Sequence, residues 1–318
     1  MLNSNIRLVY DDAILSQFRD LGTALETDES LNSIKLDPYW PKWDSPWWKA
    51  VLLLECGQAE LIPRRFIDTL IAAVDAHYLH TFPVQDGQIP EGCDPYRQII
   101  CHCALGTLCK LLVASREDVF ERLPWVYDWF TEFQLPDGGY NCDEAAYTKS
   151  RKSSFLSTLP MLEAMLDIYA STQDARLLPL LQAGADYLIS HRIFRSTSGK
   201  IIDPSWLQLS FPRYHDYDVL RGLAFVAKWT AITGAKLDLA VLNESLQIVA
   251  KLVDQDGCLK IGIDKISAEG SLYYRKEDWA WDEQAGKFAC LSELSKPGSR
   301  AIALTKQWQE LIATIGWD

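Results

Sequence analysis

The sequence has few basic residues, only three methionines and no long apolar run. Its 31 lysines and arginines are outnumbered by 43 aspartates and glutamates, which gives a net charge of −12 and a pI near 4.9. Nucleic acids and anionic membranes attract clustered basic side chains, so we expect neither as a partner. No apolar run reaches the roughly 18 residues typical of a transmembrane helix. We therefore expect no integral membrane segment.

The start of the chain also lacks the apolar core of a secretory signal. Asn3, Asn5, Arg7, Asp11 and Asp12 interrupt it with polar and charged side chains. We therefore expect a cytoplasmic protein. Thiols stay reduced in that compartment, so the eight cysteines are expected to be free thiols or metal ligands rather than a disulfide framework.

Alternating, strand-like runs are scarce, so helices must bury the 48% of residues that are hydrophobic. Some helix-like stretches carry apolar residues on one stripe only, namely 66–78, 119–133, 177–188 and 239–253. Others are apolar on nearly every side, namely 51–54, 99–112, 155–169, 219–232 and 279–294. A helix that is apolar all round is buried inside the protein. The pattern predicts surface helices that alternate with interior ones.

Turns rich in Asp and Gly separate each outer stretch from the next inner one. They stand at 85–87 (QDG), 134–139 (QLPDGG), 198–199 (SG) and 255–257 (QDG), roughly 50 to 60 residues apart. Their Gly suits a tight turn, and we expect their Asp to bond local backbone N–H groups. The spacing predicts one domain over 1–318, with a less regular hairpin at 1–58 and repeat hairpins over 59–318. All the long loops should then lie at one end, where we expect a site.

The segment 134–140 (QLPDGGY) resembles the repeat of the protein prenyltransferase and squalene (terpenoid) cyclase superfamily. The turns at 85–87 and 255–257 match that repeat in part. The resemblance implies an all-α fold, a single α/α toroid of about six helical hairpins whose inner and outer rings surround a cavity. It also implies an apolar, isoprenoid-like small-molecule substrate.

The chain departs from that superfamily in its reactive residues. Terpenoid cyclases of one class use an Asp-x-Asp-Asp acid, whereas this chain has Asp216-Tyr217-Asp218-Val219 and lacks the last Asp. Protein prenyltransferases hold zinc through Asp, Cys and His, and that spacing has no copy here. The resemblance therefore bears on the fold more than on the reaction.

Carboxylates and a histidine stand where long loops enter inner helices. Asp216, Asp218 and His215 precede one helix and Asp278 precedes another, and partial burial there could adapt them to acid or base catalysis. The alternative is that the aspartates cap these helices. We take His215, Asp216, Asp218 and Asp278 as candidate catalytic residues.

Aromatic and basic side chains occupy comparable positions at the same predicted mouth. Rings next to charges can stabilise a cation or stack on a substrate, and arginines can hold an anionic group. The alternatives are core packing for the rings and solvated loop positions for the charges. The candidate substrate-binding residues are Trp47, Trp48, Tyr96, Arg97, Arg151, Tyr214, Tyr217, Arg221, Arg275, Trp279 and Trp281.

Cysteines occupy matching places in two neighbouring long loops. Cys93 and Cys142 follow their turns closely, and Cys101-His102-Cys103 begins the inner helix between them. Thiolates and an imidazole that converge in this way can hold zinc. The candidate ligands are Cys93, Cys101, His102 and Cys142. The alternative is that the thiols are small buried hydrophobes.

Three functions remain open from the sequence. The first is a cyclase or transferase that binds an isoprenoid-like substrate in an aromatic-lined central cavity. The second is a non-catalytic binding module that keeps the toroid as a scaffold. The third is a carbohydrate-active glycosidase or lyase, which would place two carboxyl groups about 5 to 10 Å apart in an open cleft. The oligomeric state is left open.

Overall fold

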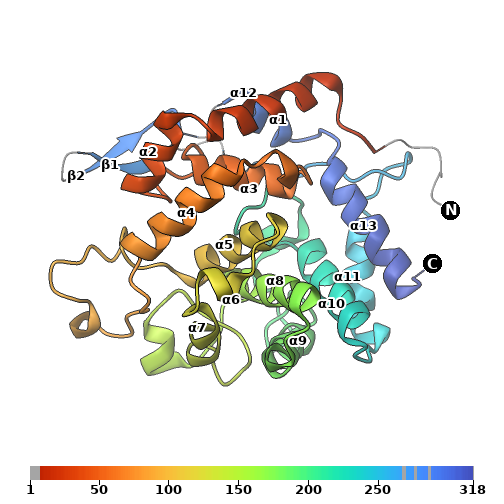
Figure 1. Cartoon of the computed structure of the whole chain (residues 1–318). Coiled ribbons are helices and arrows are strands. Elements are labelled where there is room, and N and C mark those ends of the chain that lie inside the picture. Colours follow the sequence, from red (N-terminus) through yellow and green to blue (C-terminus); the bar gives the residue numbers. More distant parts are fainter. Residues whose placement is uncertain (1–7, 267–269, 276–277, 286–287, 318) are drawn as a thin grey trace.

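The computed structural model describes residues 8–266, 270–275, 278–285 and 288–317, and this part of the chain is mostly helical (Figure 1). The longer helices are α1 (Asp12–Leu25), α2 (Asp28–Leu36), α3 (Pro46–Glu55), α4 (Arg64–His77), α5 (His102–Ala114), α8 (Phe155–Thr172), α9 (Leu178–Ser190), α10 (Val219–Thr233), α11 (Leu239–Ala250) and α13 (Ile302–Ile315). The shorter ones are α6 (Val119–Arg122), α7 (Val126–Glu132), α12 (Ala289–Leu294) and the turns η1 (Ala59–Leu61), η2 (Asp86–Gln88), η3 (Ala146–Ser150), η4 (Ala175–Leu177) and η5 (Pro204–Leu207).

The apolar helices predicted for the interior pack against one another in chain order. Helix α3 contacts α5, α5 contacts α8, and α8 contacts α10. Helix α13, which was not among the predicted interior helices, packs on α10. The closest of these contacts joins α5 and α8, because Gly106 lies against the backbone of Pro160, and a Cβ atom there would come within 2.4 Å of the Pro160 carbonyl. In Figure 1 α5 and α8 lie in the middle of the molecule, and α13 lies at its right-hand edge.

The amphipathic helices cover the interior ones from outside. Helix α9 packs on α8 and α11 on α10, while α1 lies across α3 at the top of Figure 1. Helix α4 packs on α2, which in turn contacts α3. Each buries the stripe that its sequence predicts, as Phe66, Leu70 and Val74 do on α4. No helix in the described ranges combines the length and the apolar character needed to cross a membrane.

Two predicted helices differ from the structure. The stretch 119–133 is divided into α6 and α7, because Pro124 disfavours helical backbone at Leu123, whose φ is −136°. The predicted inner helix 279–294 is wrong over its first half. There β2 (Asp278–Asp282) pairs antiparallel with β1 (Ser271–Arg275), and among the described residues of 279–294 only those of α12 are helical. Trp279 and Trp281 alternate with smaller or polar residues, which is a strand period rather than a helical one.

Candidate metal centre

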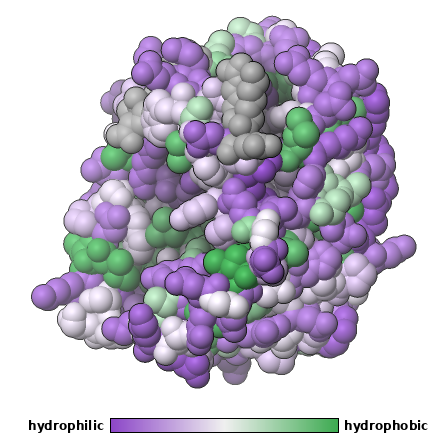
Figure 2. Space-filling model, turned by 90° about the vertical axis from the view of Figure 1, so that its left-hand side faces the viewer, coloured by the Kyte–Doolittle hydropathy of each residue, from purple (hydrophilic) through white to green (hydrophobic). Residues whose placement is uncertain are grey.

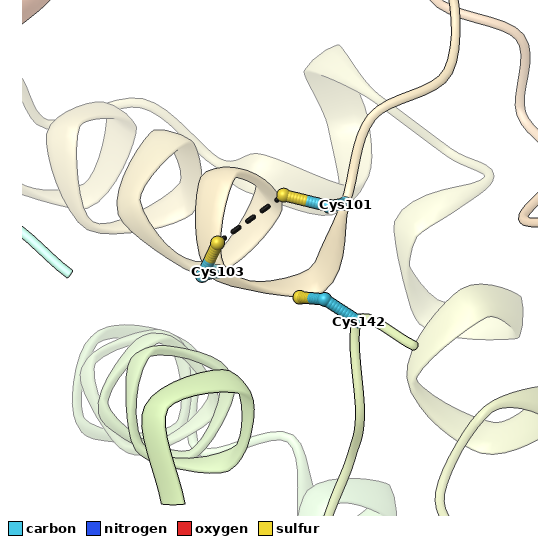
Figure 3. A group of neighbouring side chains, drawn as sticks. All are labelled: Cys101, Cys103 and Cys142. Atoms are coloured by element: carbon cyan, nitrogen blue, oxygen red, sulfur yellow. Dashed lines mark hydrogen bonds between the residues drawn. The ribbon is translucent and has the colours of Figure 1, made fainter. Parts of the chain in front are cut away.

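Three cysteine thiols from two distant segments of the chain meet at one point. The sulfurs of Cys101, Cys103 and Cys142 all lie within 4.8 Å of one another, and the Cys101 and Cys103 sulfurs are 3.2 Å apart. Figure 3 shows Cys101 and Cys103 together at the start of α5, with Cys142 arriving beside them from a separate loop. Within the described ranges this is the one group of three His, Cys, Asp or Glu residues spaced to hold a metal ion.

The start of α5 places two of the thiols. Cys101 is the N-cap residue, with extended backbone (φ −92°, ψ 165°), and Cys103 lies in the first helical turn. This change of backbone lets residues two apart turn their side chains to the same side. The free N–H groups and the dipole of a helix N-terminus also favour negative charge. Helix α5 therefore places both thiols beside the partial positive charge of its N-terminus.

The QLPDGGY turn delivers the third thiol. Gln134 donates from Nε2 to the carbonyl oxygens of Gly138 and Leu180, both at 2.9 Å, and the Asp137 carboxylate accepts from the Ser153 N–H at 2.9 Å. These bonds tie the turn to α9 and to the segment before α8. Cys142 follows, and its N–H donates to Ser157 Oγ on α8 at 2.9 Å. The repeat motif thus acts by positioning a residue that lies beyond it.

The surroundings shift the pKa values of the three thiols in different directions. The thiols of Cys101 and Cys103 donate to Cys142 and hold its pKa well below the usual range, although burial opposes this. The hydrogen bond from Cys103 favours the thiolate form of Cys101 and lowers its pKa. The hydrogen bond that Cys101 donates to Cys142, together with burial, has the larger effect and raises the pKa of Cys101 to about 12. Among the three, Cys142 is thus the thiol whose proton loss its neighbours favour most. A divalent cation would stabilise the thiolate form of all three.

A pocket of about 870 Å³ opens beside the cluster, and Cys101 and Cys142 form part of its wall. Its lining includes the apolar residues Phe82, Ile89 and Ile99 together with acidic residues of the two loops. Figure 2 shows the face of the molecule on this side, where hydrophilic surface predominates and hydrophobic side chains gather in separate patches. A small molecule in this pocket could therefore reach the thiols.

Two of the four ligands predicted from sequence belong to the cluster, and the other two do not. His102 points into the core, where its Nδ1 accepts from Trp129 Nε1 at 2.9 Å and its Nε2 lies 2.8 Å from the Tyr147 hydroxyl. Both imidazole nitrogens are thus occupied, and burial lowers the pKa of His102 to about 4. Cys93 is half-buried in the loop before α5 and is not part of the group. Cys103 takes the place that the prediction gave to them.

The candidate catalytic residues around His215 have different roles in the structure. Asp218 is buried, caps α10 by accepting from the Arg221 N–H at 2.8 Å, and forms an ion pair with Arg213. Asp218 therefore has the helix-capping role that the sequence left open as the alternative to catalysis. Asp216 is half-buried, and burial raises the pKa of its carboxyl. His215 stacks on Trp43, with ring centroids 5.9 Å apart, and burial lowers its pKa to about 3.

Most of the aromatic candidates lie in the core rather than around a cavity. Trp47, Trp48, Tyr214 and Tyr217 are at most 2% exposed. Their rings pack on neighbouring rings, as Trp48 does on Tyr214 with ring centroids 5.0 Å apart. These residues were predicted to line a substrate cavity, and the structure instead gives them a packing role.

The centre of the interior helices carries charges. A pocket of about 340 Å³ bounded by α3, α5, α8, α10 and α13 is lined by Glu55, Lys110, Glu163, Arg213 and Arg221. Arg221 donates to Glu163 at 2.9 and 2.7 Å, and Lys110 donates to Glu163 at 2.6 Å. The charges of Arg221 and Lys110 overcome burial and lower the pKa of Glu163. Arg221, predicted to bind substrate, thus belongs to an internal ion-pair network.

The remaining candidates lie nearer the surface. Tyr96 is exposed, Arg97 pairs with Asp37 and stacks on Tyr274 at 3.8 Å, and Arg151 is an exposed residue with left-handed backbone. A separate group lies on the hairpin. Asp278 is exposed, Trp279 packs edge-on against Trp40, Trp281 is 52% exposed, and Arg275 ends β1 with a side chain outside the described part of the structure.

The sequence analysis did not single out Glu163 and Lys110 as site residues, although the position of each in a helix predicted to be buried could have identified it. Each is a charged side chain inside a helix that is otherwise apolar, and such a charge is rarely buried without a partner. It also missed the segment Tyr39 to Trp43, whose aromatic residues precede α3 instead of belonging to a repeat.

The chain matches no known protein-family model and no curated protein. An account of its function therefore depends on the geometry of its own residues. Of the features described, the thiol cluster and the pocket beside it combine reactive groups with access for a small molecule.

Proposed function

We propose that the protein is a zinc-dependent transferase that holds the metal through Cys101, Cys103 and Cys142 and takes a small-molecule substrate in the adjacent pocket. The observation that carries the proposal is the convergence of three thiols from two segments within 4.8 Å beside a pocket of about 870 Å³. Cysteines that only fill a core have no need to meet in this way.

The donor set suits zinc and leaves room for chemistry. Soft thiolate ligands select zinc among the common divalent ions. Structural zinc sites use four protein ligands, whereas catalytic sites use three and keep one position for water or substrate. A zinc ion with three thiolates would lower the pKa of a fourth ligand such as a substrate thiol, which would then be a nucleophile at neutral pH.

The protein's own residues support this role around the thiols. Helix α5 contributes the positive end of its dipole, and Ser157 fixes the backbone of Cys142. The apolar residues Phe82, Ile89 and Ile99 of the lining suit the hydrocarbon part of an electrophilic substrate and limit the access of water. We therefore place an isoprenoid-like substrate in this pocket rather than at the centre of the helices.

The scaffold is proposed to be an α/α toroid. The contacts of α3, α5, α8 and α10 in chain order, with α9 packed on α8 and α11 on α10, support an inner and an outer layer. The thiol cluster lies at the start of α5, the end of an inner helix at which the repeat places its long loops.

Metal analysis tests the proposal directly. Protein purified without chelator should contain about one zinc per chain, and Cys103→Ser, Cys101→Ser and Cys142→Ser should each lose most of it. Cys93→Ser is the matched control, since Cys93 is a half-buried thiol of the same region outside the cluster. Equal zinc content in Cys93→Ser and Cys103→Ser would refute the site.

A second measurement separates a catalytic site from a structural one. In cobalt-substituted protein, a small thiol such as ethanethiol should alter the visible absorption of the metal by entering the fourth position. An unchanged spectrum at saturating thiol would show a closed, structural site. The non-catalytic alternative would then be preferred.

A further inference from the structure

A second pocket lies apart from the thiol cluster. It has a volume of about 460 Å³ and is enclosed by the segment 40–43, the segment 264–266 and the β1–β2 hairpin. It shares no lining residue with the pocket beside the thiols. Any ligand bound here would therefore be recognised by different chemistry.

Two lysines line this pocket, although the protein is strongly acidic. Lys42 and Lys265 are half-buried, and across the described ranges neither forms an ion pair. Asp264 also lines the pocket, and its one negative charge is outnumbered by the positive charges of the two lysines; one of its carboxylate oxygens accepts from the Ile266 N–H at 2.9 Å. Both lysines act on the same neighbours, since their charges lower the pKa of His215 and oppose the rise in the pKa of Asp216. Both side chains thus contribute positive charge to the lining of one pocket.

Tryptophan rings form the remaining walls. Trp40, Trp43 and Trp281 all line the pocket, and Lys42 Nζ lies 5.4 Å from the ring centre of Trp40 and 5.9 Å from that of Trp43. Trp281 is 52% exposed and stands opposite Leu272 on the hairpin, which leaves a large apolar ring available at the rim. Flat rings beside cations suit a ligand that is both planar and negatively charged.

The site is held in place by contacts on both sides. The Lys42 N–H donates to Ser271 Oγ at 2.9 Å, and Trp40 Nε1 donates to the Tyr96 carbonyl at 3.2 Å. Trp43 has left-handed backbone (φ 72°), an uncommon conformation for a bulky residue, and its ring stacks on Tyr214 at 5.2 Å. Packing on a buried ring compensates for that strain and fixes the Trp43 side chain before any ligand arrives.

We propose that this pocket binds a small planar anion, an aromatic ring that carries a carboxylate or phosphate, with the ring among Trp40, Trp43 and Trp281 and the charge at Lys42 and Lys265. The binding goes beyond the proposed zinc chemistry and uses none of its residues. Protein stripped of metal should therefore bind the anion as well as metal-loaded protein does.

The test uses 1-naphthyl phosphate as the probe and measures its affinity by calorimetry and by quenching of tryptophan fluorescence. The double variant Lys42→Gln/Lys265→Gln should bind it at least tenfold more weakly than the wild type. Lys42→Arg/Lys265→Arg should restore most of the affinity, because it keeps both charges. Lys49→Gln is the control, since that lysine pairs with Asp44 outside the pocket, and it should bind like the wild type.

Two further probes measure how much the ring and the charge each contribute to binding by the wild type. Neutral 1-naphthol and inorganic phosphate should each bind the wild type at least tenfold more weakly than 1-naphthyl phosphate. Trp281→Ala should weaken binding of the naphthyl ester but leave phosphate unaffected. Equal affinity of the double variant and Lys49→Gln for 1-naphthyl phosphate, or equal affinity of the wild type for naphthol and its phosphate, would overturn the proposal. Failure of zinc binding alone would leave these results unchanged.

Discussion

At the scale of single residues, Gly138 decides whether Cys142 reaches the other thiols. Its φ is +96°, and a Cβ atom there would lie 2.1 Å from the Ala183 carbonyl oxygen on α9. Gly138→Ala therefore meets both a disfavoured backbone conformation and a backbone clash. We expect the free energy of unfolding, measured by chemical denaturation, to fall by roughly 2–4 kcal/mol.

Gly87→Ala is the control for that substitution. Gly87 occupies the matching turn, but no atom lies within 4 Å of the position of its Cβ. The free energy of unfolding should then change by less than about 1 kcal/mol. Zinc content should also fall in Gly138→Ala and remain normal in Gly87→Ala. Equal stability of the two variants would contradict the positioning role of the QLPDGGY turn.

His215 should make stability depend on pH. Burial, with the charges of Lys42 and Arg221, lowers its pKa from 6.5 to about 3. The unfolded chain takes up this proton near pH 6.5 and the folded chain does not, so stability is greatest above pH 6.5 and falls as the pH drops towards 3. The contribution to the slope is at most about 1.4 kcal/mol per pH unit.

The variant His215→Asn removes that titration while keeping a polar side chain of similar size. Its free energy of unfolding should vary less between pH 6.5 and 3.5 than that of the wild type, by urea denaturation at several pH values. The slope should not vanish, because His102 titrates in the folded protein at about pH 4 and contributes in the same range. An identical slope in both proteins would show that His215 is protonated in the folded state.

At the scale of elements, Glu163 on α8 joins two neighbouring helices. It accepts from Lys110 on α5 and from Arg221 on α10, and the Arg221 side chain is only 4% exposed. Glu163→Gln would leave that guanidinium buried without its counter-charge. We expect the free energy of unfolding at pH 7 to fall by about 3 kcal/mol.

Asp167→Asn provides a control on the same pair of helices. Asp167 pairs with Lys228 of α10, whose side chain is 54% exposed, so the loss should be below about 1 kcal/mol. The pKa of Glu163 is lowered in the folded protein, so its contribution is full above about pH 4.5 and is lost as the pH falls further. The difference between Glu163→Gln and the wild type should therefore narrow below pH 4.

The interior helices could be predicted from the sequence because their burial requires apolar residues on nearly every side. The stretches 155–169 and 219–232 correspond to α8 and α10, which are apolar on nearly every side. The break at Pro124 and the alternation of Trp279 and Trp281 were also visible in local sequence. The partner of His102 was not, since Trp129 and Tyr147 reach it only through packing. The membership of Cys103 rather than Cys93 in the thiol cluster was not visible in the sequence either, because it depends on the backbone conformation at the start of α5.

At the scale of the whole molecule, the thiol cluster links parts that the chain separates. Helix α5 and the loop that carries Cys142 belong to successive hairpins, and the same loop is tied to α8 and α9 by Ser157 and Gln134. A metal ion held by all three thiols would cross-link these hairpins. Because it would bind only the folded arrangement, its binding free energy would add to the stability of the fold.

Removal of the metal should therefore destabilise one region more than the rest. After chelation, amide hydrogen exchange should accelerate around 99–106 and 141–154, whereas α11, on the far side of α10, should keep its protection. The midpoint of thermal unfolding should fall, and added zinc should restore both measurements. In Cys103→Ser, chelator should change neither measurement, since that variant lacks a complete ligand set. An equal response of α11 and α5 would show that zinc acts on global stability rather than through this local cross-link, and no response in the wild type would contradict the site itself.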